Sequence, residues 1–463
     1  MGRLDESMAS YLYALDLKSD DMAALNNLGN VFKDTGDLDQ AIDCYRRAAD
    51  LDLQDISSHC NLVYSIYFHP GYDETRIKSE AERFAKLHRL SATMPHKDHD
   101  RTSQRRLRIG YVSPNFRSHC QSLFTIPLLS HHDHSNFEIF CYAQLLHPDE
   151  LTSRIQGHAD VWRDTNGLDD EKLAKMITAD GIDILIDLTM HMDKGKPMLF
   201  ARRPAPVQIS WLAYPGTTGI PEIDYRLTDP WLDPVELGDE RYVEKSLRLP
   251  HTFWCYDPLT SGLQPNPLPA LSKNHVTFGC LNNFCKVTDD TLELWAGVMS
   301  AVAGSRLLLL SPLGSHRQRV LDMLKGYSIS PDRVEFVEPM TRRNYLETYH
   351  RIDICLDTLP YNGHTTSLDA YWMGVPVVTR IGSTVVGRAG WSQLNNLGLT
   401  ELAACDEQSF VKIAVELSAD LPKLVHLRQT LRHRMESSPL MDGAGFASAM
   451  ESIYRKVWQD WCV

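Results

Sequence analysis

The sequence predicts an α/β protein of two doubly wound, Rossmann-like lobes with an all-α repeat segment in front of them. From residue 107 onward, short apolar runs alternate with helical patterns, which is typical of parallel sheets covered by helices. This alternation stops in a proline-rich span at 229–274 and then restarts, which predicts two lobes. The residues before 70 instead repeat with a period of 34.

The repeat shows as matching residues 34 positions apart. Gly2-Arg3-Leu4-Asp5 recurs as Gly36-Asp37-Leu38-Asp39, and Tyr11 recurs as Tyr45. This period, with its small and large packing positions, resembles the tetratricopeptide repeat, a pair of antiparallel helices. About one and a half units cannot bury their own apolar faces, so we expect them to stack on further repeats or on the domain that follows.

Apolar runs predict five strands in each lobe, with helices such as Asp170–Ala179 between them. The strands expected in the first lobe are Leu107–Val112, Phe137–Tyr142, Ile182–Leu188, Val207–Trp211 and Tyr225–Thr228. Those expected in the second lobe are Val276–Cys280, Arg306–Ser311, Arg333–Val337, Asp353–Leu356 and Val375–Thr379.

The same patterns set the domain boundaries that we expect. These are a repeat segment at 1–70, a helical linker at 71–105, a first lobe at 106–245, a connection at 246–274, a second lobe at 275–435 and a C-terminal helix at 436–463. Two such lobes usually enclose their ligand in a cleft, which indicates an enzyme.

Composition and charge exclude several classes of protein. The net charge of −13 argues against a nucleic-acid-binding face, so an anionic ligand must be held by a few placed cations. No apolar run reaches the roughly 20 residues that span a bilayer, and acidic residues near the start argue against a signal peptide. The ten cysteines form no CxxC pair, which predicts reduced thiols in a cytoplasmic protein.

The stretch at 359–376, LPYNGHTTSLDAYWMGVP, is the strongest candidate for a ligand site. It follows a predicted buried strand and precedes a helical pattern. Gly363 allows a tight turn between them, and the hydroxyl of Thr365 or Thr366 is expected to cap the helix. A turn of this kind points backbone N–H groups and the positive end of the helix dipole at an anion.

Side chains from three loops are expected around this anion. His364 lies beside it as a donor, and Asp369, one turn into the helix, can accept from ribose hydroxyls. Lys286 follows the first strand of the second lobe, and Arg342 follows the third. Because the carboxyl ends of parallel strands share one edge, these cations should converge on a diphosphate. The alternatives are an ordinary capped turn and solvated surface cations.

The first lobe offers two loops at its strand ends. His119, after the first strand, is expected to donate to a substrate or act as a base, or else to make a structural hydrogen bond. The loop WLAYPGTTG at 211–219 can bring backbone close to a sugar, or form a structural turn. No metal site is expected, because His131-His132-Asp133-His134 lies in a predicted surface connection.

Four long motifs extend this interpretation: LRIGYVSPNFRSH, RPAPVQISWLAYPGTTGIPEIDYRLTD, LPHTFW and YNGHTTSLDAYWMGVPVVT. With the repeats, they resemble the O-linked N-acetylglucosaminyltransferase family, which includes the SPINDLY branch, and its bacterial members in particular. The resemblance implies a GT-B fold and an inverting transfer of N-acetylglucosamine from UDP-GlcNAc to serine or threonine hydroxyls of proteins. It also implies no cofactor, no metal, and protein acceptors guided by the repeat helices.

Matched to the family motifs, the residues of the predicted anion site bind the donor. Lys286 is expected to neutralise the departing UDP diphosphate. The other donor-side positions are His364, Thr365 and Thr366 on phosphate, Asp369 on ribose, Met340 against the base, and Arg342 and Asn283 nearby. On the acceptor side, the matching positions are Ala213, Tyr214 and Pro215 facing the sugar, and the cleft histidine His119.

Two questions stay open at this point. The general base is His119, a water or a phosphate oxygen. SPINDLY proteins transfer fucose from GDP-fucose, and VTFGCLNNFCK resembles that branch, whereas His364 and Asp369 favour UDP-GlcNAc. Other classes are a repeat scaffold that senses a nucleotide sugar without turnover, and a glycoside hydrolase, for which no convincing carboxylate pair is found.

Overall fold

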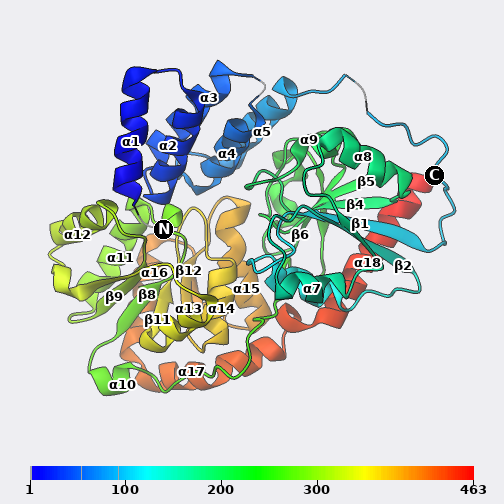
Figure 1. Cartoon of the computed structure of the whole chain (residues 1–463). Coiled ribbons are helices and arrows are strands. Elements are labelled where there is room, and N and C mark those ends of the chain that lie inside the picture. The colour runs from blue at the N-terminus through cyan, green and yellow to red at the C-terminus, as the bar shows by residue number, and fades with distance from the viewer. Residues whose placement is uncertain (1–2, 54, 92) are drawn as a thin grey trace. The chain divides into compact units, whose positions relative to one another are not determined.

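The computed structural model describes residues 3–53, 55–91 and 93–463, so Gly2 of the predicted repeat lies outside the described residues. The chain forms two compact units. The repeat-containing unit holds the residues up to Asp73 and those at 258–438, and the first-lobe unit holds 74–257 and 439–463. Each unit has one parallel sheet flanked by helices (Figure 1). The predicted fold class is thereby confirmed.

The described residues of the repeat segment form four helices and a short 3₁₀ turn. These are α1 (Leu4–Leu17), α2 (Met22–Asp34), α3 (Leu38–Leu51), α4 (Ile56–Ser65) and η1 (Ile66–Phe68). Gly29 of α2 faces Tyr45 of α3, where an added Cβ would lie 2.7 Å from a ring carbon. Glycine therefore permits the close approach of the two helices.

The second lobe has a parallel sheet in the order β10-β9-β8-β11-β12-β13. Its strands are β8 (Thr277–Cys280), β9 (Arg306–Leu310), β10 (Val334–Val337), β11 (Ile354–Leu356), β12 (Val377–Arg380) and β13 (Ala403–Ala404). The chain runs outward from β8 to β10 and then returns to β11, so the strand order reverses between β8 and β11. Ligands of doubly wound sheets bind beyond the strand ends at such a reversal.

Helices connect and cover the strands of the second lobe (Figure 1). They are α10 (Ala270–Lys273), α11 (Asp289–Ala301), α12 (His316–Gly326), α13 (Arg342–Thr348), α14 (Thr365–Trp372), α15 (Ala389–Leu397), α16 (Glu407–Ala419) and α17 (Leu421–Glu436). Short 3₁₀ turns follow β8 at η4 (Phe284–Lys286) and β12 at η7 (Val385–Arg388).

The first-lobe unit is built on the same plan, with the order β3-β2-β1-β4-β5-β6-β7. Its strands are β1 (Leu107–Ser113), β2 (Phe137–Ala143), β3 (Val161–Asp164), β4 (Ile184–Asp187), β5 (Val207–Ser210), β6 (Tyr225–Thr228) and β7 (Lys245–Arg248). Its helices are α5 (Glu74–Leu87), α6 (Ser122–Leu129), α7 (Glu150–Gln156), α8 (Asp170–Ala179), α9 (Pro197–Phe200) and α18 (Gly443–Cys462).

All ten predicted strands are present, but three further strands were not predicted. β3 and β7 are the two edges of their sheet, and their residues are half-exposed and include charges, so they show no apolar run. β13 has only two residues. Edge strands of this kind lack the hydrophobic pattern on which strand prediction depends.

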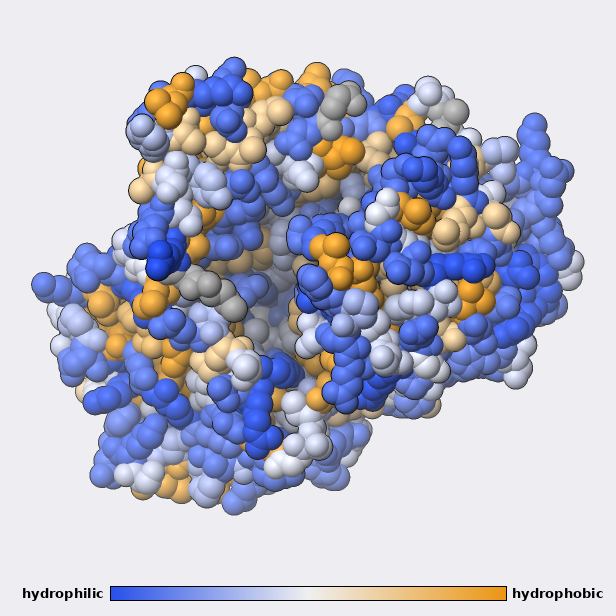
Figure 2. Space-filling model, viewed as in Figure 1, coloured by the Kyte–Doolittle hydropathy of each residue, from blue (hydrophilic) through white to orange (hydrophobic). Residues whose placement is uncertain are grey.

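The described part of the chain contains no helix that is both long and apolar enough to cross a membrane. Figure 2 shows hydrophilic residues over most of the visible face, with hydrophobic residues scattered in small groups. Exposed apolar side chains of α1 include Leu12, Tyr13 and Leu17.

The predicted cytoplasmic location stays a prediction.

The Gly29 contact gives a test of the repeat packing. Gly29→Ala should lower the free energy of unfolding by about 1–3 kcal/mol, because the Tyr45 ring is fully buried and bound to Asn30 through its hydroxyl at 2.8 Å. Gly326→Ala in α12 is the matched control, since no described atom lies within 4 Å of its added Cβ. It should raise stability by about 0.5 kcal/mol. Urea denaturation measures both, and equal effects would contradict this packing.

Candidate functional site

Lys286 ends the η4 turn after β8 and reaches the loop between β11 and α14. Its Nζ donates to the backbone carbonyl of Asn362 at 2.8 Å and lies 3.9 Å from the ring centroid of Tyr361. The two loops at the reversal of strand order thus meet through one ammonium group. This is the meeting point that the sequence indicated for a pyrophosphate.

A buried carboxylate shapes the β11–α14 loop. Asp357 Oδ1 accepts from the N–H groups of Gly363 at 2.6 Å and Thr358 at 2.9 Å, and its Oδ2 accepts from the hydroxyl of Thr379 at 2.7 Å. Burial raises the pKa of Asp357, while these hydrogen bonds and the charge of Lys286 oppose the increase. No local sequence pattern indicates a site role for Asp357, because its hydrogen-bond partners are brought to it only by the fold.

The helix start differs from the predicted one. α14 begins at Thr365, so His364 occupies the N-cap position, and no side chain among the described residues caps the helix. The predicted threonine cap is therefore wrong. Thr366 instead donates its hydroxyl to Asn282 Oδ1 at the end of β8. This bond ties the two loops together and leaves the first N–H groups of α14 without a side-chain cap.

His364 is buried next to Lys286. Burial, and then the charge of Lys286, lower its pKa well below the ordinary value. Its Nε2 lies 3.3 Å from the carbonyl oxygen of Val386, and a carbonyl can only accept. The neutral ring therefore carries its proton on Nε2, and Nδ1 is an acceptor. His364 can donate from Nδ1 to an anion, as predicted, only in its protonated form.

Arg342 and Asp369 bind each other. Two guanidinium nitrogens of Arg342, in the first turn of α13, lie 2.7 and 2.5 Å from the two carboxylate oxygens of Asp369, which is buried. Each carboxylate oxygen has a second lone pair, so this pairing is compatible with acceptance from ribose hydroxyls. Met340 and Asn283 are exposed at the ends of the neighbouring loops, and both roles stay predictions.

The remaining predicted residues belong to the first-lobe unit. His119 follows β1, and its Nδ1 accepts from the backbone N–H of Gln121 at 3.2 Å. Burial, with a smaller effect of the Arg117 charge, lowers the pKa of His119 to about 4. The neutral ring therefore carries its proton on Nε2, which makes that nitrogen a donor.

The loop at 211–219, after β5, is held by buried contacts. Tyr214 is buried, Ala213 is half-buried, and Leu212 has a left-handed φ of +85°. The carbonyl oxygen of Pro215 accepts from the buried guanidinium of Arg226 at 2.6 Å. Leu212 thus has a backbone conformation that bulky residues rarely adopt, which is typical of functional loops.

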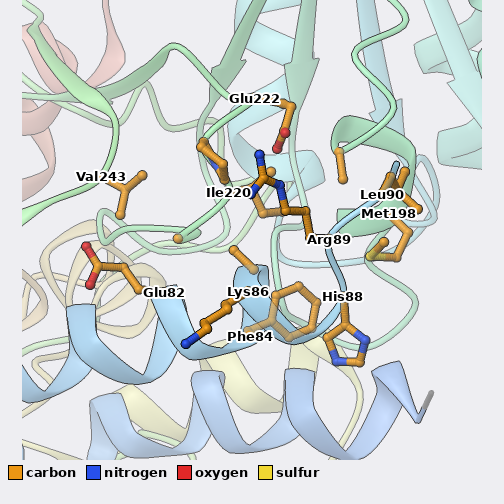
Figure 3. Close-up of a pocket in the computed structure, with 14 residues that line it drawn as sticks. Glu82, Phe84, Lys86, His88, Arg89, Leu90, Met198, Ile220, Glu222 and Val243 are labelled. Atoms are coloured by element: carbon orange, nitrogen blue, oxygen red, sulfur yellow. The ribbon is translucent and has the colours of Figure 1, made fainter. Parts of the chain in front are cut away.

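The first-lobe unit also has a cavity of about 510 Å³ beside α5. Figure 3 shows Phe84 and Ile220 among its apolar lining residues, with Lys86, Arg89 and Glu222 around them. The described lining contains none of the predicted site residues. In the same unit, His132 and His134 are bound to Glu451 and Asp160 respectively.

Comparison with known proteins places these features in a family. The model of glycosyl transferase family 41 matches residues 74–261 and 267–450, and a tetratricopeptide repeat model matches 23–55. The chain belongs to glycosyl transferase family 41. The family match covers the segments after β1, β5, β8, β10 and β11, so the predicted site residues all lie within it.

The chain is similar in sequence to plant proteins named SPINDLY. A Petunia hybrida protein named "Probable UDP-N-acetylglucosamine--peptide N-acetylglucosaminyltransferase SPINDLY" is 38% identical over 404 residues, which is 86% of this chain but 43% of that protein. The chain thus spans less than half of that relative.

Solved structures match the fold. A mutant of the O-GlcNAc transferase of Thermobaculum terrenum is 34% identical, with a TM-score of 0.93, over 100% of this chain and 88% of that one. Anabaena HepE in complex with UDP is 10% identical, with a TM-score of 0.51, over 76% of this chain and 100% of that one, so it supports the fold alone.

The lowered pKa of His119 predicts a pH dependence of stability in this family 41 chain. Because the folded pKa of about 4 lies below the ordinary 6.5, the folded form binds this proton less readily than the unfolded form. The stability contributed by neutral His119 is present above pH 6.5 and is lost as the pH falls towards 4. His119→Asn should therefore make the fall in urea midpoint between pH 7 and 4.5 shallower.

The control is His426→Asn, which removes an exposed histidine of α17. It should leave the wild-type slope unchanged. A His119→Asn slope equal to that of wild type would contradict the half-buried, neutral state of His119.

Proposed function

We propose that this family 41 chain transfers N-acetylglucosamine from UDP-GlcNAc to serine or threonine hydroxyls of proteins. Support comes from the family match, the name of the Petunia hybrida relative and the similarity to a bacterial O-GlcNAc transferase. The observation that carries the proposal is the contact of Lys286 with the β11–α14 loop at the reversal of strand order.

In the proposed reaction, an acceptor hydroxyl attacks the anomeric carbon from the side opposite UDP, which inverts the configuration there. The bond between the anomeric carbon and the phosphate oxygen breaks, and negative charge grows on the leaving diphosphate. Lys286 and the uncapped N-terminus of α14 would stabilise this charge more strongly in the transition state than in the bound donor. We propose that these groups take the place of a metal ion.

The nucleoside part would lie on the α13 side of the same edge. Asp369 would accept from the ribose hydroxyls while Arg342 holds its carboxylate in a fixed orientation. Thr365, at the start of α14, would offer its hydroxyl and backbone N–H to phosphate, and the backbone near Met340 would lie against the base. The shape of this end of the site would then decide between uracil and guanine.

His119 would assist the reaction as a hydrogen-bond donor. Its Nδ1 already accepts from Gln121, so the neutral ring offers an N–H at Nε2 instead of a basic lone pair. We therefore propose that the acceptor proton leaves to a water or to a phosphate oxygen. Ala213, Tyr214 and Pro215 would face the sugar, and protein acceptors would be guided by the repeat helices.

Nucleotide binding tests the donor. UDP or UDP-GlcNAc at 100 times its Kd should stabilise the fold by about 2.7 kcal/mol, seen as a higher Tm, whereas GDP and GDP-fucose should do little. Excess EDTA should leave the UDP effect unchanged if no metal is needed. Preferential stabilisation by GDP and GDP-fucose would instead favour the fucose-transferring alternative.

Substitution of Lys286 tests the chemistry. Lys286→Ala should lower turnover of UDP-GlcNAc with a protein acceptor by about 10²–10³-fold, because one donor to the leaving group is lost. Lys412→Ala, at an exposed position of α16, is the control and should leave turnover unchanged. Product formation by mass spectrometry measures both. Near-normal turnover of Lys286→Ala would rule out this role, and a wild type without turnover would favour the nucleotide-sensing scaffold.

A further inference from the structure

The ring of Tyr361 lies where the repeat segment meets the β11–α14 loop. It is buried, and it stacks on Phe68 with a centroid distance of 4.8 Å and an interplanar angle of 22°. The same ring lies 3.9 Å from Lys286 Nζ and 4.7 Å from the centroid of the His364 ring. One side chain therefore contacts the repeats and two residues of the proposed phosphate site.

The cation–π contact between Tyr361 and Lys286 restricts where the lysine ammonium can lie. A lysine ammonium sits at the end of a flexible four-carbon stem and loses much rotamer freedom when it is held. An aromatic face attracts a cation by about 0.5–1 kcal/mol at exposed sites and by about 2 kcal/mol when water is excluded. The Tyr361 ring and the Asn362 carbonyl together restrict the position of the Lys286 ammonium.

Phe68 is in turn held by the repeat segment. It ends η1, directly after α4, and is almost fully buried. The ring of Tyr64 contacts it edge-to-face, with a centroid distance of 5.0 Å and an interplanar angle of 82°. Because this ring is packed within the repeat segment, its stack on Tyr361 joins the repeats to the loop.

A second contact joins the repeats to the turn that carries Lys286. An added Cβ on Gly36, between α2 and α3, would lie 3.3 Å from the ring of Phe284 in η4. Nearby, Arg319 donates to the carbonyl of Thr35 at 3.4 Å. The repeat segment thus supports both loops that meet at Lys286.

We infer that Tyr361 is a positioning residue for the Lys286 ammonium, and that the repeat helices keep Tyr361 in place through Phe68. The inference rests on the proposed function for the role of Lys286 in binding a diphosphate. Its consequence is that the repeats act on the donor site as well as on protein acceptors. A change in the repeats should therefore alter UDP affinity when no acceptor is present.

The position of the ammonium can be measured without any nucleotide. In protein labelled with ¹³Cε-lysine, the Lys286 signal is assigned with Lys286→Arg, and the Tyr361 ring current should shift it upfield. The shift should persist in Tyr361→Phe, disappear in Tyr361→Leu and shrink in Phe68→Leu. Phe410→Leu, a buried substitution in α16 of the same unit, is the matched control and should leave it unchanged. An unchanged signal in Tyr361→Leu would overturn the inference.

UDP titration by calorimetry then tests the consequence. Tyr361→Leu should weaken UDP binding about 5–30-fold, which corresponds to the strength of one cation–π contact. Tyr361→Phe should bind within about twofold of wild type, Phe68→Leu should fall between them, and Phe410→Leu should match wild type. In a Lys286→Met background, Tyr361→Leu should have no further effect, because its action passes through Lys286.

The outcomes separate the inference from the proposed function. If wild type binds UDP and Tyr361→Leu binds it equally well, the positioning role is wrong. If wild type binds no UDP, the proposed function is wrong, and the lysine signal alone decides whether the ring positions the ammonium.

Discussion

The geometry of the site depends on how a flexible ammonium is held at the reversal of strand order. Lys286 is fixed by a carbonyl oxygen and an aromatic face, both supplied by the β11–α14 loop. That loop keeps its shape because the carboxylate of Asp357 accepts the N–H groups of Gly363 and Thr358. Without this acceptor, buried donors would be left unsatisfied at a cost of about 1–3 kcal/mol each. The position of the Lys286 ammonium therefore depends on the Asp357 carboxylate, which follows β11.

The charges of the site respond to one another. Burial raises the pKa of Asp357 and lowers that of His364, while the Lys286 charge opposes the first shift and adds to the second. Before a ligand binds, Lys286 thus favours an ionised Asp357 and a neutral His364. A diphosphate would act in the opposite sense on His364, because negative charge favours the imidazolium. Binding of a diphosphate would therefore favour protonation of His364.

Much of the site could be predicted because local hydrophobic patterns locate the ends of the strands. The apolar runs place Lys286, Arg342 and the β11–α14 loop after parallel strands, and parallel strands end at one edge. Other features depend on contacts between distant segments and leave no local pattern. The hydroxyl of Thr366, a good cap by sequence, is instead bound to Asn282. The proton position on His119 is set by one backbone N–H group, which only the folded loop provides.

The stack of Phe68 on Tyr361 also bears on why a short repeat segment remains folded. Helical repeats that cannot bury their apolar faces alone need a neighbour, and here the neighbour is the lobe that carries Lys286. The contact acts in both directions, because the Tyr361 ring that packs on Phe68 of the repeats also contacts the Lys286 ammonium. If the repeat segment needs this contact for stability, it cannot move independently of the β11–α14 loop. Displacement of the repeats would in turn change the position of Tyr361 and Lys286. Recognition of a protein by the repeats and binding of a nucleotide by the lobe would then share one set of buried contacts.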